Sequence, residues 1–225
     1  MAVDLAPSFA QRGFALLDGV LTQPQCEQVL AHLASGAGPG TRNTLGQVWC
    51  QQLARQLRQY SALQALLPPT YRAIQCTYFE KSVANNWVVS VHQDQSVPVA
   101  QRVEHPALQA WSEKEGQTFV RAPQDLLDSL VAVRLHLDPC TVQDGPLRVF
   151  AGSHTLGRVD ADQAAQLKSR YREHACVAAA GTALVMRPLL LHASSKASGS
   201  SLRRVLHFLL APELPPYGLQ WRSAF

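Results

Sequence analysis

The pattern of hydrophobic and polar positions in the first part of the chain is mostly helical. A short strand-like run at 13–20 comes before Thr22, whose spacing from Gln25 is that of a capping box at a helix N-terminus. Apolar residues then recur at helical spacing as far as Gly36, a residue type that often follows the last helical turn. The sequence therefore predicts a helix that starts after Thr22 and ends at Gly36, followed by a loop at 36–43.

A second helical pattern extends over 45–67, with a break near Ser61, and from Tyr71 the periodicity becomes that of short strands. These strand-like runs are separated by turn residues and lie near 72–82, 87–93, 130–138, 147–151, 174–178, 182–187, 189–194 and 203–210. Many short strands with turns between them are typical of a closed barrel or a double-sheet architecture. We therefore expect a mainly β fold with flanking helices.

One long connection, residues 95–128, interrupts the strands. It exceeds ordinary loop lengths of about 12–15 residues, and it mixes large apolar side chains such as Trp111 and Phe119 with charges. A lid that closes over a bound substrate uses both kinds of residue, because closure excludes water and completes the pocket. We expect a long lid loop here; the alternative is a static loop docked on the barrel surface.

Composition excludes several classes of protein. The chain has 225 residues, of which 47% are hydrophobic and 16% charged, and this suits one globular domain with a substantial core. It contains no run of about 18 apolar residues that would span a membrane, and its N-terminus lacks the pattern of a secretory signal. The five cysteines are scattered and form no C-x-x-C pair, so we expect buried, reduced thiols in a cytoplasmic protein.

The net charge of +4 permits acidic partners without requiring them. Lys and Arg are dispersed along the chain, and Arg203 and Arg204 form its only pair of adjacent arginines. Nucleic-acid surfaces normally carry a denser basic stripe. The sequence therefore does not favour nucleic acid as a partner.

The segment VVSVHQDQSVPV (88–99) carries the first candidate chemistry, because a strand-like run contains His92 and Asp94. Side chains of a strand repeat with a period of two, so both groups point to the same face and can bind one metal ion. A histidine and a carboxylate at this spacing also occur as a simple hydrogen-bonded pair. The segment alone leaves both interpretations open.

A second segment, RPLLLHASSKASGSSLRRVLHFLLAP (187–212), supplies His192 at the end of an apolar run and Arg203 eleven residues later. Two imidazoles and one carboxylate are the facial triad of non-haem Fe(II) oxygenases, and a guanidinium is a planar fork for a carboxylate. Strand alternation separates the two adjacent arginines. Arg204 shares a face with bulky Leu and Phe residues that suit helix packing, so Arg203 is expected to point into the barrel.

These segments resemble the phytanoyl-CoA dioxygenase family of Fe(II)/2-oxoglutarate oxygenases. Three stretches carry the resemblance: VHQDQSV (91–97), DGPLRVFAGSHTLG (144–157) and LLHASS…LRRVLHF (190–208). Their order and spacing are similar to those of the family over residues 9–215. The resemblance implies a double-stranded β-helix, a cupin-like jelly-roll core at 71–212 with a mostly helical flank at 1–70, within a single domain at 1–225.

The resemblance also implies a cofactor set and a reaction. It assigns His92, Asp94 and His192 to Fe(II), with 2-oxoglutarate and dioxygen as cosubstrates and ascorbate as a supporting reductant. The expected reaction is hydroxylation of an aliphatic C–H bond of a small-molecule substrate, with release of succinate and CO2. The identity of that substrate is not implied.

Four further site residues follow from the same resemblance. Arg203 is the expected partner of the distal carboxylate of 2-oxoglutarate, and Ser194, two residues after the last metal ligand, often assists it. Gln75 precedes the first ligand by seventeen residues and lies where relatives contact the cosubstrate. The chain departs from the family at Arg134, where a tryptophan is common, so this arginine is expected to bind either the cosubstrate or an acidic substrate.

Other functions are compatible with parts of this pattern. Two histidines and a carboxylate also describe a zinc-dependent hydrolase, although the sequence contains no H-E-x-x-H motif. A non-catalytic jelly-roll binding module would be expected to have lost part of the triad or its arginine. An oxygenase that demethylates nucleic acid would show basic and aromatic clustering, which the sequence lacks.

Overall fold

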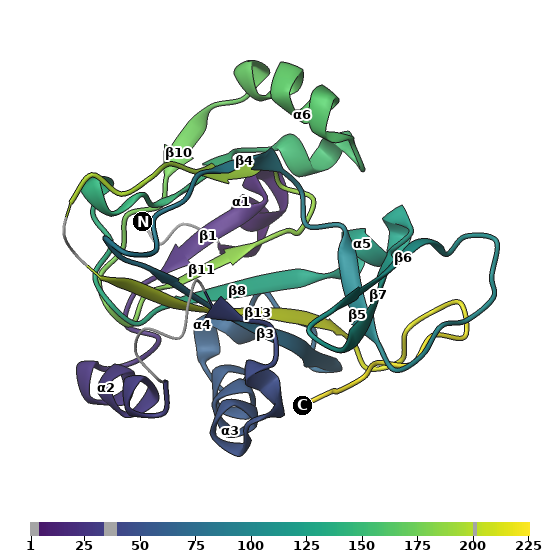
Figure 1. Ribbon diagram of the computed structural model, residues 1–225, viewed down its shortest axis with the longest axis horizontal. Helices are drawn as coiled ribbons and strands as arrows, with labels where there is room; N and C mark the ends of the chain where they lie inside the picture. Colours follow the sequence, from purple (N-terminus) through teal and green to yellow (C-terminus); the bar gives the residue numbers. More distant parts are fainter. Residues whose placement is uncertain (1–4, 34–39, 200–201) are drawn as a thin grey trace.

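Two antiparallel sheets face each other in the computed structural model, which describes residues 5–33, 40–199 and 202–225 (Figure 1). The larger sheet has the strand order β1-β11-β8-β13-β3-β2, and the smaller sheet has the order β10-β9-β12-β4. From β3 onward, strands of one sheet are interleaved along the chain with strands of the other, which is the arrangement of a jelly-roll. The predicted fold class, a mainly β jelly-roll with flanking helices, is confirmed.

The strands of the two facing sheets follow the predicted runs closely. Their bounds are β1 (Phe14–Leu17), β2 (Gly40–Thr41), β3 (Tyr71–Lys81), β4 (Val89–His92), β8 (Val131–His136), β9 (Leu147–Phe150), β10 (Glu173–Ala175), β11 (Ala183–Met186), β12 (His192–Ser194) and β13 (Arg203–Pro212). The strand predicted at 189–194 starts only at His192. Its apolar first half is buried in a turn instead, in which the amide of Leu190 donates to the carbonyl of Arg187.

Helices cover the outer side of the larger sheet. The helices are α1 (Leu5–Arg12), α2 (Gln23–Ala31), α3 (Val48–Leu57), α4 (Ser61–Gln64), α5 (Gln124–Ser129) and α6 (Ala161–Leu167), and the 3-10 helices are η1 (Thr44–Gly46), η2 (Val142–Asp144), η3 (Ser153–Leu156) and η4 (Lys168–Arg170). In Figure 1, α2, α3 and α4 lie below this sheet. Their apolar sides share a core with the outward residues Leu206, Phe208 and Leu210 of β13.

The predicted helix boundaries are largely correct. The capping box of Thr22 and Gln25 forms at the start of α2, and the break near Ser61 separates α3 from α4. Helix α2 ends at Ala31, and the predicted stop at Gly36 lies outside the described residues. The predicted loop at 36–43 is described only from Gly40, where β2 begins. All five cysteines are buried free thiols, as expected, and no helix among the described residues is long and apolar enough to span a membrane.

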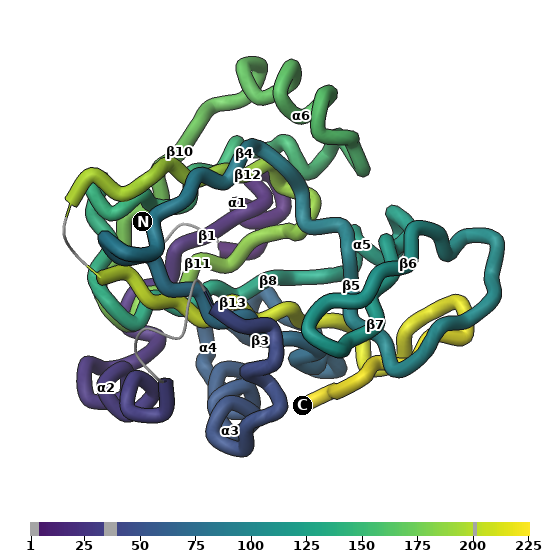
Figure 2. Tube along the Cα trace, in the orientation of Figure 1, coloured from purple at the N-terminus to yellow at the C-terminus, as the bar shows by residue number. Residues whose placement is uncertain are grey.

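The prediction of a long loop at 95–128 is wrong. This segment forms a third antiparallel sheet, β5-β7-β6, from β5 (Ser96–Val99), β6 (Gln109–Lys114) and β7 (Gln117–Arg121), and then enters α5. Val97, Val99 and Val120 are buried in a core that they share with jelly-roll residues such as Leu184 and Met186, while Phe119 lines a cavity instead. Figure 2 shows this sheet beside the barrel, next to the C-terminal segment, to which it is tied by the bond from Ala100 N to Gln220 O.

Candidate active site

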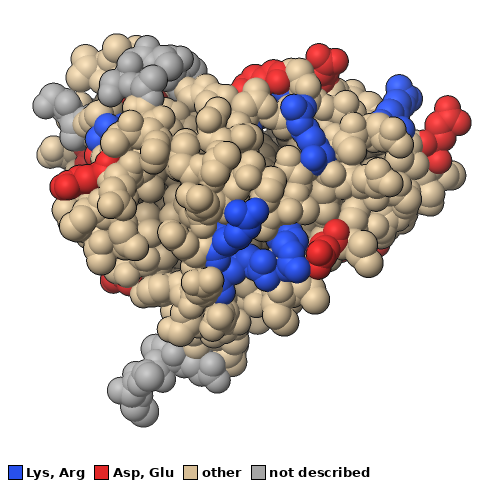
Figure 3. All heavy atoms as spheres, turned by 90° about the horizontal axis from the view of Figure 1, so that it is seen from below, with Lys and Arg blue, Asp and Glu red and all other residues tan. Residues whose placement is uncertain are grey.

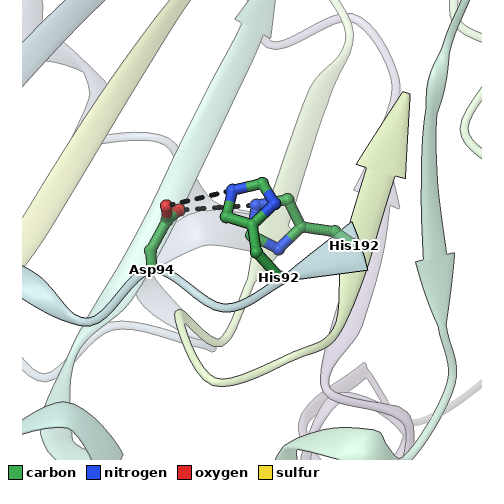
Figure 4. Close-up of side chains that lie close together, drawn as sticks. All are labelled: His92, Asp94 and His192. Carbon is green, nitrogen blue, oxygen red and sulfur yellow. Dashed lines mark ion pairs between the residues drawn. The ribbon is translucent and has the colours of Figure 1, made fainter. Parts of the chain in front are cut away.

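His92, Asp94 and His192 converge on one point in the cavity between the facing sheets (Figure 4). His92 ends β4, Asp94 follows it closely, and His192 begins β12. In the antiparallel pair of β4 and β12 the two histidines are directly opposite, with their ring centroids 4.2 Å apart. One ligand atom of each residue lies within 4.8 Å of the other two, which suits a single metal ion.

Backbone carbonyls fix both imidazole rings. Nδ1 of His92 lies 2.8 Å from the carbonyl oxygen of Ser90, and Nδ1 of His192 lies 2.9 Å from that of Leu190. A carbonyl oxygen only accepts, so each Nδ1 must carry the proton and donate it. The opposite nitrogen, Nε2, is then left with a lone pair, and in both residues it faces the carboxylate of Asp94, at 3.8 and 3.7 Å. This is how metal-binding histidines are usually oriented.

The protonation states of His192 and Asp94 also suit metal binding. Burial lowers the pKa of His192 to about 4, so its imidazole is neutral at physiological pH. Burial alone would raise the pKa of Asp94, but the nearby imidazoles and the guanidinium of Arg134 outweigh this and lower it. The centre therefore offers a carboxylate and neutral nitrogen lone pairs, the forms in which these groups bind metals.

His207 is a further site residue, which sequence reasoning did not select. It lies on β13, its Nε2 is 3.7 Å from Oδ2 of Asp94, and its Nδ1 is buried without a hydrogen-bond partner. Burial lowers the pKa of His207 to about 4. One signal was available in the sequence: alternation along β13 places His207 on the same face as Arg203.

His92, Asp94 and His192 line a cavity of about 390 Å³ that includes residues from all three sheets. Aromatic side chains form part of its wall, namely Phe79, Trp87 and Phe119. Its charged lining among the described residues consists of Asp94 and the basic residues Arg42, Lys114, Arg134 and Arg203. The cavity is therefore of a size for a small molecule and is rich in positive charge.

Arg203 lines this cavity, as expected from strand alternation, which directs it into the barrel. Its side chain is 3% exposed, and Nη1 donates to the carbonyl of Gly145 at 2.5 Å. Gly145 has a φ of 60°, and a Cβ there would lie 2.5 Å from the carbonyl oxygen of Ser195, so glycine is required for this close approach. The turn at Gly145 thus holds the guanidinium of Arg203 against the cavity wall.

Lys81 and Ser194 lie next to Arg203. Arg203 pairs with Lys81 across β13 and β3, and Nζ of Lys81 donates to Oγ of Ser194 at 3.3 Å and to the carbonyl of Ser195 at 2.6 Å. Burial, with the charges of Arg203 and Arg134, lowers the pKa of Lys81 to about 8. The sequence placed Ser194 here but gave Lys81 no defined role, since only the fold brings the end of β3 beside β12.

Gln75 and Arg134 also line the cavity, on β3 and β8. Gln75 donates through Nε2 to Oγ1 of Thr77 at 2.9 Å. Arg134 is buried, its Nε has no partner, and its guanidinium lies 5.4 Å from the ring centroid of Phe79. All seven residues predicted for the site therefore line one cavity.

A hairpin of the third sheet borders the cavity. Lys114 and Phe119 of β6 and β7 contribute to its wall, and the turn between these strands has positive φ at Glu115 and Gly116, 51° and 68°. The Glu115 carboxylate accepts hydrogen bonds from Oγ1 of Thr41 at 2.7 Å and from the amide and Nη1 of Arg42 at 2.9 and 3.0 Å. The tip of the hairpin is thereby attached to the segment that starts with β2.

Comparisons with known proteins agree with this description. The family model described as phytanoyl-CoA dioxygenase (PhyH) matches residues 9–205. No curated protein sequence matches the chain.

Solved structures with the same fold share little sequence with the chain. The non-heme alpha ketoglutarate dependent epimerase SnoN from nogalamycin biosynthesis is 17% identical, with a TM-score of 0.65 over 92% of this chain and 79% of SnoN. HygX from Streptomyces hygroscopicus, crystallised with nickel and 2-oxoglutarate, is 15% identical, with a TM-score of 0.65 over 94% of this chain and 86% of HygX. EctD from S. alaskensis is 17% identical, with a TM-score of 0.65 over 100% of this chain and 84% of EctD.

Proposed function

The chain belongs to the phytanoyl-CoA dioxygenase family, and we propose that it is an Fe(II)- and 2-oxoglutarate-dependent dioxygenase. Its reaction would hydroxylate an aliphatic C–H bond of a small molecule and release succinate and CO2. The observation that carries this proposal is the convergence of His92, Asp94 and His192 with both imidazole Nε2 atoms directed inward. Two imidazoles and one carboxylate form the facial triad of Fe(II) oxygenases.

The residues present fit such a metal. The three candidate ligands are within 4.8 Å of one another, and backbone carbonyls hold both rings in the tautomer that a metal requires. Asp94, His92 and His192 would hold the iron. When bound, iron and 2-oxoglutarate supply the oxidising power for an attack on an unactivated C–H bond, with dioxygen as oxidant and ascorbate as supporting reductant.

The protein's own contribution is to bind and orient the organic ligands. Arg203 would bind the distal carboxylate of 2-oxoglutarate, because its guanidinium is buried in the cavity wall and backed by Gly145. Ser194 would add a hydroxyl donor, which Lys81 keeps oriented through its own hydrogen bond. Gln75 would contact the cosubstrate from β3 with its amide, whose position Thr77 restrains.

The cavity wall would select and shield the substrate. Phe79, Trp87 and Phe119 offer apolar surface close to the metal ligands, so a bound molecule would displace water from the reacting centre. The volume of about 390 Å³ suits a small organic molecule. On the face shown in Figure 3, basic side chains form one compact group and otherwise stand apart, which does not favour a nucleic-acid substrate.

The main alternatives are a zinc-dependent hydrolase with the same three ligands and a non-catalytic binding module. A hydrolase has no need of a buried arginine facing the metal pocket, whereas Arg203 serves the cosubstrate in the proposed oxygenase. A binding module has no need of three neutral or anionic ligands in metal-binding form. Structures with the same fold include an epimerase and a carbocyclase. Product analysis therefore has to identify whether the C–H bond is hydroxylated.

One experiment separates these functions. Metal-free protein is loaded anaerobically with Fe(II) or with Zn(II), and 2-oxoglutarate binding and stoichiometry are measured by calorimetry. Dioxygen, ascorbate and pools of small metabolites are then added, and succinate release is recorded. We expect succinate only with iron, stimulated by some pools. Turnover of a hydrolysable substrate by the zinc form without 2-oxoglutarate, or absence of metal-dependent 2-oxoglutarate binding, would refute the proposal.

A further inference from the structure

The cavity contains more positive charge than the proposed cofactors neutralise. Of the described residues that line it, only Asp94 is acidic, whereas four are Lys or Arg. The negative charges of Asp94 and the 2-oxoglutarate dianion balance the positive charges of an iron dication and Arg203. Arg134 then remains as a cation for which the metal and the cosubstrate supply no partner.

Arg134 also has fewer polar partners than the other arginines of the site. Its guanidinium makes no hydrogen bond or ion pair with any described residue, and its Nε is buried without a partner. Arg203 differs, since it donates to the carbonyl of Gly145, and Arg204 makes two hydrogen bonds to the carboxylate of Asp138. A buried cation without a partner is unfavourable for folding, so its presence points to a ligand.

The position of Arg134 suits a ligand that reaches the metal ligands. Arg134 pairs with His207 across β8 and β13, and His207 in turn lies 3.7 Å from Asp94. Cζ of its guanidinium lies over the ring of Phe79, 5.4 Å from the ring centroid. A guanidinium binds a planar carboxylate through two parallel hydrogen bonds.

Building on the function proposed above, we propose that the substrate of this enzyme is a carboxylic acid whose anionic carboxylate is bound by Arg134. The function proposed above assigns the distal carboxylate of the cosubstrate to Arg203, beside which Lys81 and Ser194 lie, and this leaves Arg134 for the substrate. The remainder of the substrate lies against Phe79, Trp87 and Phe119, with its reacting C–H bond close to the metal ligands.

A further cation in the cavity wall supports an anionic substrate. Lys114 lines the cavity with its Nζ 5.0 Å from the ring centroid of Phe119 and has no ion pair with a described residue. The other lining cation, Arg42, forms an ion pair with Glu115 at 3.0 Å. Positive charge along a cavity raises the local concentration of anions.

The test compares ligands of equal length and different charge. Hexanoate and hexanamide are titrated calorimetrically into anaerobic, iron-loaded protein that is saturated with 2-oxoglutarate. The variants are Arg134→Met, which removes the charge at similar length, and Arg148→Met as a control, because Arg148 pairs with Glu173 outside the cavity. We expect wild type and the control to bind hexanoate at least about 10-fold more tightly than hexanamide, as one charge-assisted pair provides. In Arg134→Met this preference disappears while the Kd of 2-oxoglutarate changes less than about threefold.

The other possible results of these titrations would contradict either the carboxylic-acid proposal or the dioxygenase function. Equal binding, or no binding, of the two probes to wild type overturns the carboxylic-acid proposal, as does an Arg134→Met variant that loses 2-oxoglutarate affinity. Failure of wild type to bind 2-oxoglutarate refutes the dioxygenase function itself, which is therefore tested separately in the same titrations.

A melting experiment supplies a second measurement. Arg134→Met should raise the melting temperature of the ligand-free protein by about 2–4 °C, because an unpartnered buried charge is replaced by an apolar side chain. A lower melting temperature would assign Arg134 a structural role and overturn the proposal.

Discussion

Arg203 and Arg204 are consecutive residues whose side chains lie on opposite faces of β13. Arg203 points into the cavity between the sheets, where it is 3% exposed. Arg204 points away from the cavity and binds the carboxylate of Asp138 through Nε and Nη2 at 2.8 and 2.7 Å. Strand alternation thus leaves Arg203 available to a ligand, whereas Arg204 stabilises the fold.

This separation gives opposite expectations for the two alanine variants. Arg203→Ala should raise the Kd of 2-oxoglutarate by about 10- to 100-fold, because a charge-assisted pair contributes about 1.5–3 kcal/mol. Arg204→Ala should leave that Kd nearly unchanged and lower the free energy of unfolding instead, since the carboxylate of Asp138 loses its two hydrogen bonds from the guanidinium and keeps only the one from the backbone amide. Calorimetry and urea denaturation measure the two effects, and the reverse pattern would contradict the assignment of the two faces.

Replacing either of the two proposed histidine ligands should abolish iron binding. His92→Ala and His192→Ala should each abolish stoichiometric Fe(II) binding, measured by metal analysis after anaerobic loading, together with all 2-oxoglutarate turnover. His105→Ala is the matched control, because His105 is exposed and lies outside the cavity. Iron content equal to that of wild type in both ligand variants would refute the proposed centre.

His136 predicts how the stability of the protein depends on pH. This residue is buried, and burial lowers its pKa from 6.5 to about 3. Below pH 6.5 the unfolded chain takes up a proton that the folded protein excludes, so the contribution of His136 to stability should be constant above pH 7 and fall as pH decreases toward 3. The slope from one such histidine is at most about 1.4 kcal/mol per pH unit.

Urea denaturation of metal-free protein between pH 7.5 and 5 measures that slope. His136→Asn should make it shallower, whereas His105→Asn should leave it as in wild type. An unchanged slope in His136→Asn would show that this histidine does not contribute.

The segment at 95–128 remains the predicted lid, although it forms a sheet and not a loop. Residues 97–122 should become protected from hydrogen exchange when 2-oxoglutarate and a substrate bind. Glu115→Ala should speed exchange at 109–121 in the free protein, because three hydrogen bonds to Thr41 and Arg42 are lost. Glu113→Ala, an exposed change on the same strand, is the control. Identical exchange with and without ligands would leave a static, docked hairpin.

The residues that the sequence predicted to lie together, and that line one cavity, have a local signal. Alternation directs His92 and Asp94 to one face and Arg203 away from Arg204, and the end of an apolar run before a polar loop marks His192. Lys81 has no such signal, because its neighbour Ser194 is 113 residues away in the chain and is brought close only by the pairing of both sheets. Alternation along β13 also marks His207.

The segment at 95–128 shows a different limit. Its length suggested a loop, yet SVPV (96–99) alternates as a strand does and QTFVR (117–121) is rich in residues that favour strands. Val97 and Val120 are buried in the same core as the jelly-roll strands, so the segment is held by packing and is not a free loop.

The direct pairing of His92 with His192 links metal capture to the order in which the chain folds. His92 and Asp94 are close in the chain and can meet early, but His192 reaches them only when β12 has paired with β4. Contacts of such large sequence separation form slowly and late. A nascent or partly unfolded chain therefore presents an incomplete ligand set with little affinity for iron. The metal would be acquired after the two sheets have assembled. During unfolding, loss of the metal would indicate that the smaller sheet has opened before the helices of the opposite side unfold.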